Sequence, residues 1–260
     1  MTVAAGVLCD AGIALAADMK YEDPGGSGYC HTLFNLRKRS GFTASIVGTG
    51  DYDLIDAIVG EFDNCLPDAA SLDELAGIVA DRNLQYRERP LPRSPDPVRM
   101  PLDYSLLLGL ASPAEGVRLL KMDRGGTQRV ERFEIIGGSQ EPAQTFVRNM
   151  YSKDMPIEEA EYLAIYAVYK GKTAEEGSPG ETDCTAILAD GTRKTLSARI
   201  VKQTEEYIEA FTHAFDIKLP PALWYNDETG VLEAMLKDYI LDLLRRRQEL
   251  RELRKADYYK

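Results

Sequence analysis

The chain has 260 residues, of which 44% are apolar and 28% are charged, so it can form one large globular domain, or one domain plus an appendage. Its 42 acidic residues outnumber its 31 basic ones, and the formal net charge of −11 argues against a protein whose whole surface binds nucleic acid. No apolar run approaches the ~20 residues of a membrane-spanning helix, so we expect no membrane partner. The N-terminal segment lacks the basic region of a signal peptide, and we expect a cytoplasmic protein.

The first half of the chain predicts two hairpins and then two helices. Residues 2–9 and 13–18 are apolar runs joined by a tight turn, and residues 32–36 and 42–47 flank a basic turn. The glycine-rich stretch 24–28 between the hairpins predicts a mobile loop. Apolar residues then recur at helical spacing after Gly50. Ser71 and Glu74 form a capping-box pattern that starts a second helix.

The second half predicts more strands, more helix pairs and one further hairpin. The expected strands cover residues 104–110, 117–122, 129–136, 182–188 and 192–200, and the expected helices cover 141–151, a segment starting at Pro156, and two C-terminal segments. Runs of strands that alternate with helix pairs favour an α+β fold in which two stacked antiparallel sheets are covered by helices, a four-layer αββα sandwich. We expect this core over residues 1–200 and a helical extension over residues 201–260.

Patterns for metals and cofactors are missing from the sequence. The cysteines, which form no CxxC pair, are Cys9, Cys30, Cys65 and Cys184, and two histidines are too few to complete a zinc site with them. There is no Walker loop and no GxGxxG motif. We therefore expect no metal and no cofactor.

Four short motifs, in the expected order, resemble those of proteasome β-subunits, members of the N-terminal nucleophile (Ntn) hydrolase superfamily. The start of the chain, residues 2–18, resembles a mature β-subunit with its N-terminal threonine, glycine turn and Leu-Ala-Ala-Asp strand. Residues 136–143 are similar to the Gly-Ser-Gly start of the third helix, residues 155–160 to the start of the fourth helix, and residues 182–187 to the strand after it. The resemblance covers residues 2–200 and implies the αββα fold.

The resemblance also implies a set of catalytic residues. Thr2 matches the nucleophile once Met1 is removed, because the amine of the same residue then serves as the base. Asp18 matches the buried acid, Glu175 and Ser178 match an Asp and a Ser near the threonine amine, and Ser139 lies one place after the position of the Gly-Ser-Gly serine. On the residues alone, Asp18 also fits a structural acid at a strand end, and Glu175 with Ser178 fits a solvated helix end.

Two departures from the family bear on activity. The family has a lysine at the start of its third strand, where this chain has Thr32. Lys20 points to the face of Asp18 if that strand continues and is a candidate substitute, although a solvated loop lysine also fits. A retained Met1 would turn the Thr2 amine into an amide, which cannot act as a base.

These observations leave three functions open. The resemblance implies a threonine-type amide-bond hydrolase that acts on peptides within a homo-oligomeric ring or spiral. The missing lysine favours instead an inactive scaffold or assembly subunit of the same fold, and a hydrolase of small amides is the third. The apolar stripe of the last helix ends in Arg245, Arg246 and Arg247, which fits a partner-facing helix as well as one packed on its own core.

Overall fold

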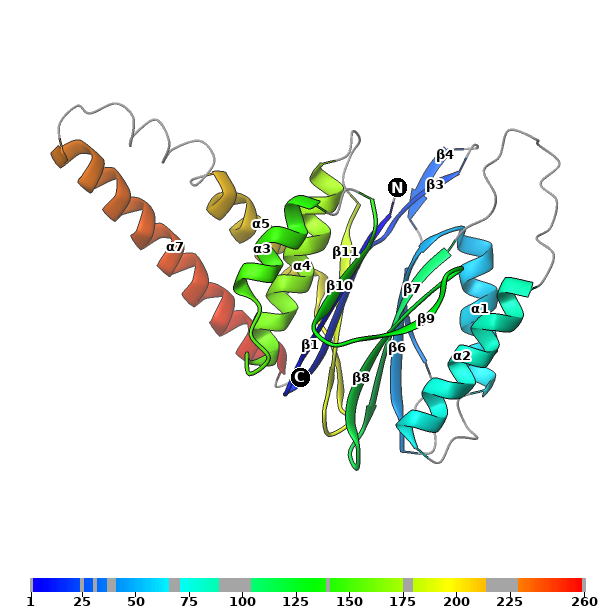
Figure 1. Cartoon of the computed structure of the whole chain (residues 1–260). Coiled ribbons are helices and arrows are strands. Elements are labelled where there is room, and N and C mark those ends of the chain that lie inside the picture. The colour runs from blue at the N-terminus through cyan, green and yellow to red at the C-terminus, as the bar shows by residue number, and fades with distance from the viewer. Residues whose placement is uncertain are drawn as a thin grey trace. The chain divides into compact units, whose positions relative to one another are not determined.

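The computed structural model describes residues 2–23, 26–29, 32–36, 41–65, 71–88, 104–138, 141–174, 180–213 and 229–258. Contacts divide the chain into two compact units, one up to Thr195 and one from Leu196 on. Within the first unit, two five-stranded antiparallel sheets face each other, and helices cover both outer faces (Figure 1). This order confirms the predicted αββα sandwich.

The first sheet lies against helices α3 and α4 and has the strand order β10-β1-β2-β11-β12. Its strands are β1 (Val3–Cys9), β2 (Gly12–Asp18), β10 (Phe133–Gly137), β11 (Thr182–Leu188) and β12 (Arg193–Thr195). The first two strands form the predicted hairpin, in which Ala4 pairs with Ala17. Every residue of β2 is buried, as a run that is apolar on both faces predicts.

The second sheet lies against helices α1 and α2 and has the strand order β5-β6-β7-β8-β9. Its strands are β5 (Leu33–Asn35), β6 (Thr43–Gly50), β7 (Tyr104–Ser112), β8 (Gly116–Asp123) and β9 (Gly126–Val130). The two sheets share one apolar cluster, which includes Ala4, Leu15, Ala17, Leu107 and Leu119. A second cluster fills the space between this sheet and helices α1 and α2.

The helices of the first unit follow the apolar spacing of the sequence. They are α1 (Tyr52–Cys65), α2 (Leu72–Glu88), α3 (Glu141–Met150) and α4 (Ile157–Thr173). The predicted cap of α2 is present, because the N–H of Glu74 donates to Ser71 Oγ over 3.1 Å. The Leu72 N–H at the same helix end donates to the carboxylate of Glu115, which adds a second cap from the β7–β8 turn.

The second unit contains α5 (Ala198–His213) and α7 (Thr229–Tyr258), which pack on each other. On α7, Arg246 Nε lies 2.9 Å from a carboxylate oxygen of Asp242, one helical turn away. Arg245 contacts the other oxygen of the same carboxylate. Two of the three arginines that end the apolar stripe therefore bind a neighbouring acid on their own helix. Among the described residues, no helix is long and apolar enough to cross a membrane.

Four sequence-based boundaries are wrong. Residues 26–28, expected in a loop, belong to β4 (Gly26–Tyr29), which pairs with β3 (Lys20–Asp23) in a separate two-stranded sheet. The strand expected over 129–136 is two strands in different sheets, β9 and β10, with a break after Val130. The last strand stops at Thr195, and α5 begins three residues later. Pro156 is the N-cap of α4 and not its first helical residue.

Candidate functional site

Thr2 lies beside the end of β10 and is hydrogen-bonded to the residue that follows this strand. The N–H of Gly138 donates to the carbonyl oxygen of Thr2 over 3.4 Å. Gly137 has φ +93°, and a Cβ atom at this position would lie 2.0 Å from that same oxygen and 2.9 Å from Thr49 Cγ2. A glycine is required here both by the backbone conformation and by the close approach. The Gly-Gly pair thus fixes the position of Thr2 at the end of the sandwich.

Asp18 ends β2 beside the start of β1. Its side chain is almost fully buried, at 1% exposure. The pairing of Ala4 with Ala17, continued by one residue, places Asp18 opposite Val3, the residue after Thr2. Ala17 belongs to the cluster between the sheets, so strand alternation directs Asp18 to the other face, toward α4. Asp18 therefore lies at the same end of the sheet as Thr2 and under a helix.

Thr32 occupies the place at which the family has its lysine, and it supports Asp18 through the backbone. It precedes β5, is 5% exposed, and its hydroxyl donates to the carbonyl oxygen of Asp18 over 2.8 Å. A threonine can make this bond but carries no charge. The structure thus gives Thr32 a role in positioning the end of β2.

Of the other predicted site residues, only the backbone of Lys20 lies in the described part of the chain. Strand β2 ends at Asp18, and Lys20 starts β3 of the separate sheet, where it pairs with Tyr29. The condition that β2 continues to Lys20 is therefore not met, and the side chain of Lys20 lies outside the described part of the chain. Ser139, Glu175 and Ser178 also lie outside the described residues, as does Met1. Their predicted roles remain predictions.

Lys172 is a charged residue near Asp18 that the sequence reasoning missed. It lies in the last turn of α4 and is only 6% exposed. Its Nζ donates to the carbonyl oxygen of Gly180 over 2.7 Å and to Thr182 Oγ1 over 2.9 Å. The inward stripe of α4 would have identified it, because Lys172 follows the buried residues Glu161 and Val168 at helical spacing.

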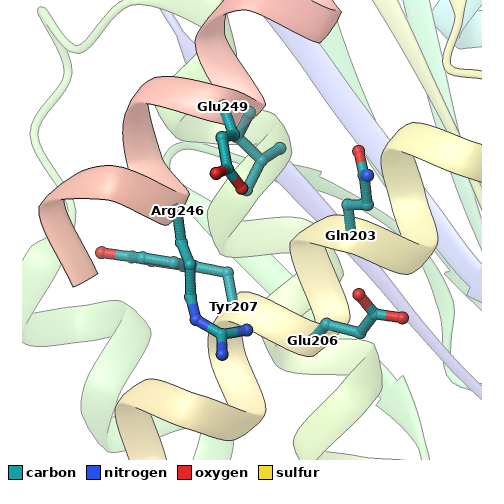
Figure 2. Close-up of a pocket in the computed structure, with 6 residues that line it drawn as sticks. Gln203, Glu206, Tyr207, Arg246 and Glu249 are labelled. Atoms are coloured by element: carbon teal, nitrogen blue, oxygen red, sulfur yellow. The ribbon is translucent and has the colours of Figure 1, made fainter. Parts of the chain in front are cut away.

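A shallow pocket lies in the second unit, between α5 and α7 (Figure 2). The residues that line it are Gln203, Glu206, Tyr207, Arg246, Glu249 and Leu250. Figure 2 shows Arg246 of α7 reaching toward the side chains of α5 beside Tyr207. The lining mixes both signs of charge and includes none of the predicted catalytic residues. In the part of the chain that the structure describes, no group of three or more His, Cys, Asp or Glu residues could hold a metal ion.

Comparisons with known proteins bear out the resemblance seen in the sequence. The family model of proteasome subunits matches residues 97–187, from β7 to β11, and so covers neither Thr2 nor Asp18. No curated protein sequence matches the chain.

Solved structures of Anbu proteins share the fold. Anbu (ancestral beta-subunit) from Yersinia bercovieri superposes with a TM-score of 0.68 at 16% identity, over 85% of this chain and 98% of that one. Anbu from Hyphomicrobium sp. strain MC1 gives 0.66 at 16% identity, over 82% and 96%. The helical assembly of the Anbu complex from Pseudomonas aeruginosa gives 0.64 at 16% identity, over 85% and 97%. The chain therefore has a proteasome-like fold.

Proposed function

We propose that the chain is a threonine-type amide-bond hydrolase that acts on peptides, with Thr2 as the nucleophile after removal of Met1. The proposal rests on one arrangement. Thr2 is held by the Gly137–Gly138 turn, and the buried Asp18 lies at the same end of the sheet, opposite the residue after Thr2. The proteasome-like fold supports the proposal. The proposal keeps residues 1–200 as the Ntn-hydrolase core and 201–260 as a helical extension.

The chemistry needs an unblocked amine on Thr2. In the proposed first step, Thr2 Oγ1 attacks the peptide carbonyl while the α-amine accepts the hydroxyl proton, since an α-amine has an ordinary pKa of ~7.7–8.0. The amide nitrogen then leaves with a proton from that amine, and water hydrolyses the resulting ester. As the family resemblance implies, a backbone N–H near a Gly-rich turn would stabilise the oxyanion. Ser139, Glu175 and Ser178 would assist near the amine, as the family resemblance implies.

The test uses protein whose intact mass shows that the chain begins at Thr2. We expect a threonine-reactive electrophile to label this form once per chain, and a mixed set of fluorogenic peptides to be cleaved. Thr2→Ser keeps a hydroxyl and should retain labelling, whereas Thr2→Val has nearly the same volume without the hydroxyl and should lose it. A correctly processed, folded protein that is not labelled would refute the hydrolase.

An inactive scaffold of the same fold is the second candidate, and Thr32 is the observation that favours it. The hydroxyl of Thr32 supports Asp18 without supplying the charge that the family lysine supplies. General acid–base help is worth ~10²–10⁴-fold, so a chain without that charge could be too slow to function as an enzyme. Failure of labelling in the mass-verified protein, together with intact assembly, would select this function.

We propose that the chain forms a homo-oligomer, a ring or a spiral. The relative from Pseudomonas aeruginosa is described as a helical assembly. On α7, Leu241 and Leu244 are 55% and 53% exposed, which leaves apolar surface for a second copy to cover. Light scattering should give a mass above that of one chain, and Leu241→Ser with Leu244→Ser should lower it. Leu84→Ser, at an exposed leucine of α2, is the control and should leave the mass measured by light scattering unchanged.

A further inference from the structure

The end of α4 places a buried ammonium next to the strand that carries Asp18. Lys172 Nζ lies 2.9 Å from Thr182 Oγ1, and Thr182 is the cross-strand partner of Asp18 in the pairing of β11 with β2. Side chains of such partners share a face of the sheet, with Cβ atoms ~4.5–5.5 Å apart. The helix-facing side of the sheet therefore holds Asp18, Thr182 and the Lys172 ammonium in one row.

Two further contacts fix the helix end in this place. A Cβ atom at Gly171 would lie 2.8 Å from Val3 Cγ1, so α4 rests directly on the residue after Thr2. Lys172 Nζ also donates to the carbonyl oxygen of Gly180, just before β11. Both acceptors of the ammonium lie at or just before the start of β11, and they hold the charge at the end of the sheet where Thr2 precedes β1.

Burial of a charge at this depth costs free energy of folding unless an opposite charge and hydrogen bonds offset the loss of hydration. Transfer of an ammonium from water to a protein interior costs several kcal/mol, and an apolar side chain of similar volume would fill the same space without that cost. The carboxylate of Asp18 is equally buried, at 1% exposure. Opposite charges within ~4–6 Å of each other stabilise one another, and Thr182 brings the two buried groups onto neighbouring positions of one face.

We propose that Lys172 supplies, from α4, the positive charge that Thr32 does not supply from the third strand, and that it is a positioning residue for Asp18 and Thr2. The role in catalysis rests on the proposed function, whereas the pairing of Lys172 with Asp18 does not. Glu181 and Asp183 are the other described acids near this end of β11. Asp183 pairs with Ala17 and so lies on the opposite face, between the sheets.

Asp183 provides a matched control for a double-mutant cycle on stability. Urea midpoints are measured at pH 7 for Lys172→Met, Asp18→Asn and the double variant. We expect the double variant to unfold close to the midpoint of the weaker single variant, because each single variant already breaks the pair. The same cycle with Asp183→Asn should be additive. Additive loss in both cycles would overturn the pairing, whether or not the protein is an enzyme.

The second readout is the pH profile of probe labelling at Thr2. An opposite charge within ~4–6 Å lowers the pKa of a carboxyl group by about one unit or more, so removal of the ammonium should move the labelling profile to higher pH by a similar amount. Lys170→Met, on the same helix turn but partly exposed, should leave the profile in place. An unmoved profile in Lys172→Met would overturn the positioning role. An unlabelled wild-type protein would overturn it as well, together with the hydrolase.

Discussion

Substitution of Gly137 by alanine should displace Thr2, and the size of the effect follows from two separate costs. The residue has φ +93°, and a non-glycine residue in the left-handed region costs ~1–2 kcal/mol. The new Cβ atom would also lie 2.0 Å from the Thr2 carbonyl oxygen, which is a backbone atom and cannot turn away. Overpacking of this kind costs ~1–3 kcal/mol. We therefore expect Gly137→Ala to lower the free energy of unfolding by ~2–5 kcal/mol.

Gly116 separates the two costs. It has φ +79°, but a Cβ atom there would meet nothing within 4 Å. Gly116→Ala should therefore show only the backbone cost of ~1–2 kcal/mol. Urea unfolding of both variants, monitored by circular dichroism, gives the difference directly when the slopes of the two transitions agree. Equal losses, within ~0.5 kcal/mol, would refute the close contact between Gly137 and Thr2.

Three further outcomes are expected. Asn83→Ala should lower the free energy of unfolding by ~1–3 kcal/mol in urea titrations, because the buried hydroxyl of Tyr104 donates to Asn83 Oδ1 over 2.6 Å; a loss comparable to that of a surface substitution would contradict this. The Arg246 guanidinium lowers the pKa of Asp242. The ionised Asp242 therefore contributes to the stability of the fold above the ordinary carboxyl pKa, and this contribution is lost as the pH falls through the lowered pKa. Thermal melts between pH 7 and pH 2 should show a smaller loss for Asp242→Asn than for the wild type, and parallel curves would argue against the pair. Burial raises the pKa of the Cys9 thiol, so a thiol reagent at pH 8 should modify Cys9 only as fast as the protein opens, and modification at the rate of a peptide thiol, read by peptide mass, would show an accessible side chain.

The layers of the fold could be predicted because the sequence carries strong local signals. The hairpin of β1 and β2 follows from two apolar runs around Asp10 and Ala11, and the start of α2 follows from Ser71. Boundaries set by tertiary pairing could not be predicted. The chain from Arg129 to Ile136 reads as one strand, yet Glu131 and Arg132 carry it from one sheet to the other. Nothing local to those residues signals a change of sheet.

The candidate site was predicted in part for the same reason. Thr2 and Asp18 stand out in the sequence because they flank a strand pattern that resembles a known family. Lys172 does not, since it lies far along the chain in a lysine-containing helix end that also fits a solvated surface. Its burial depends on packing of α4 against β1, which brings Gly171 onto Val3. Only the three-dimensional contact distinguishes this lysine from the partly exposed Lys170.

The two sheets are linked to each other at both sides of the sandwich. On one edge, the Arg193 guanidinium of β12 donates to the carbonyl oxygens of Leu36 and Ala44 in the other sheet, over 2.7 and 3.3 Å. On the opposite edge, the chain itself crosses from β9 to β10 through two residues. Each side of the sandwich therefore carries a connection between the two sheets. If the chain is the proposed hydrolase, a peptide would approach Thr2 from the strand ends, because Thr2 immediately precedes β1.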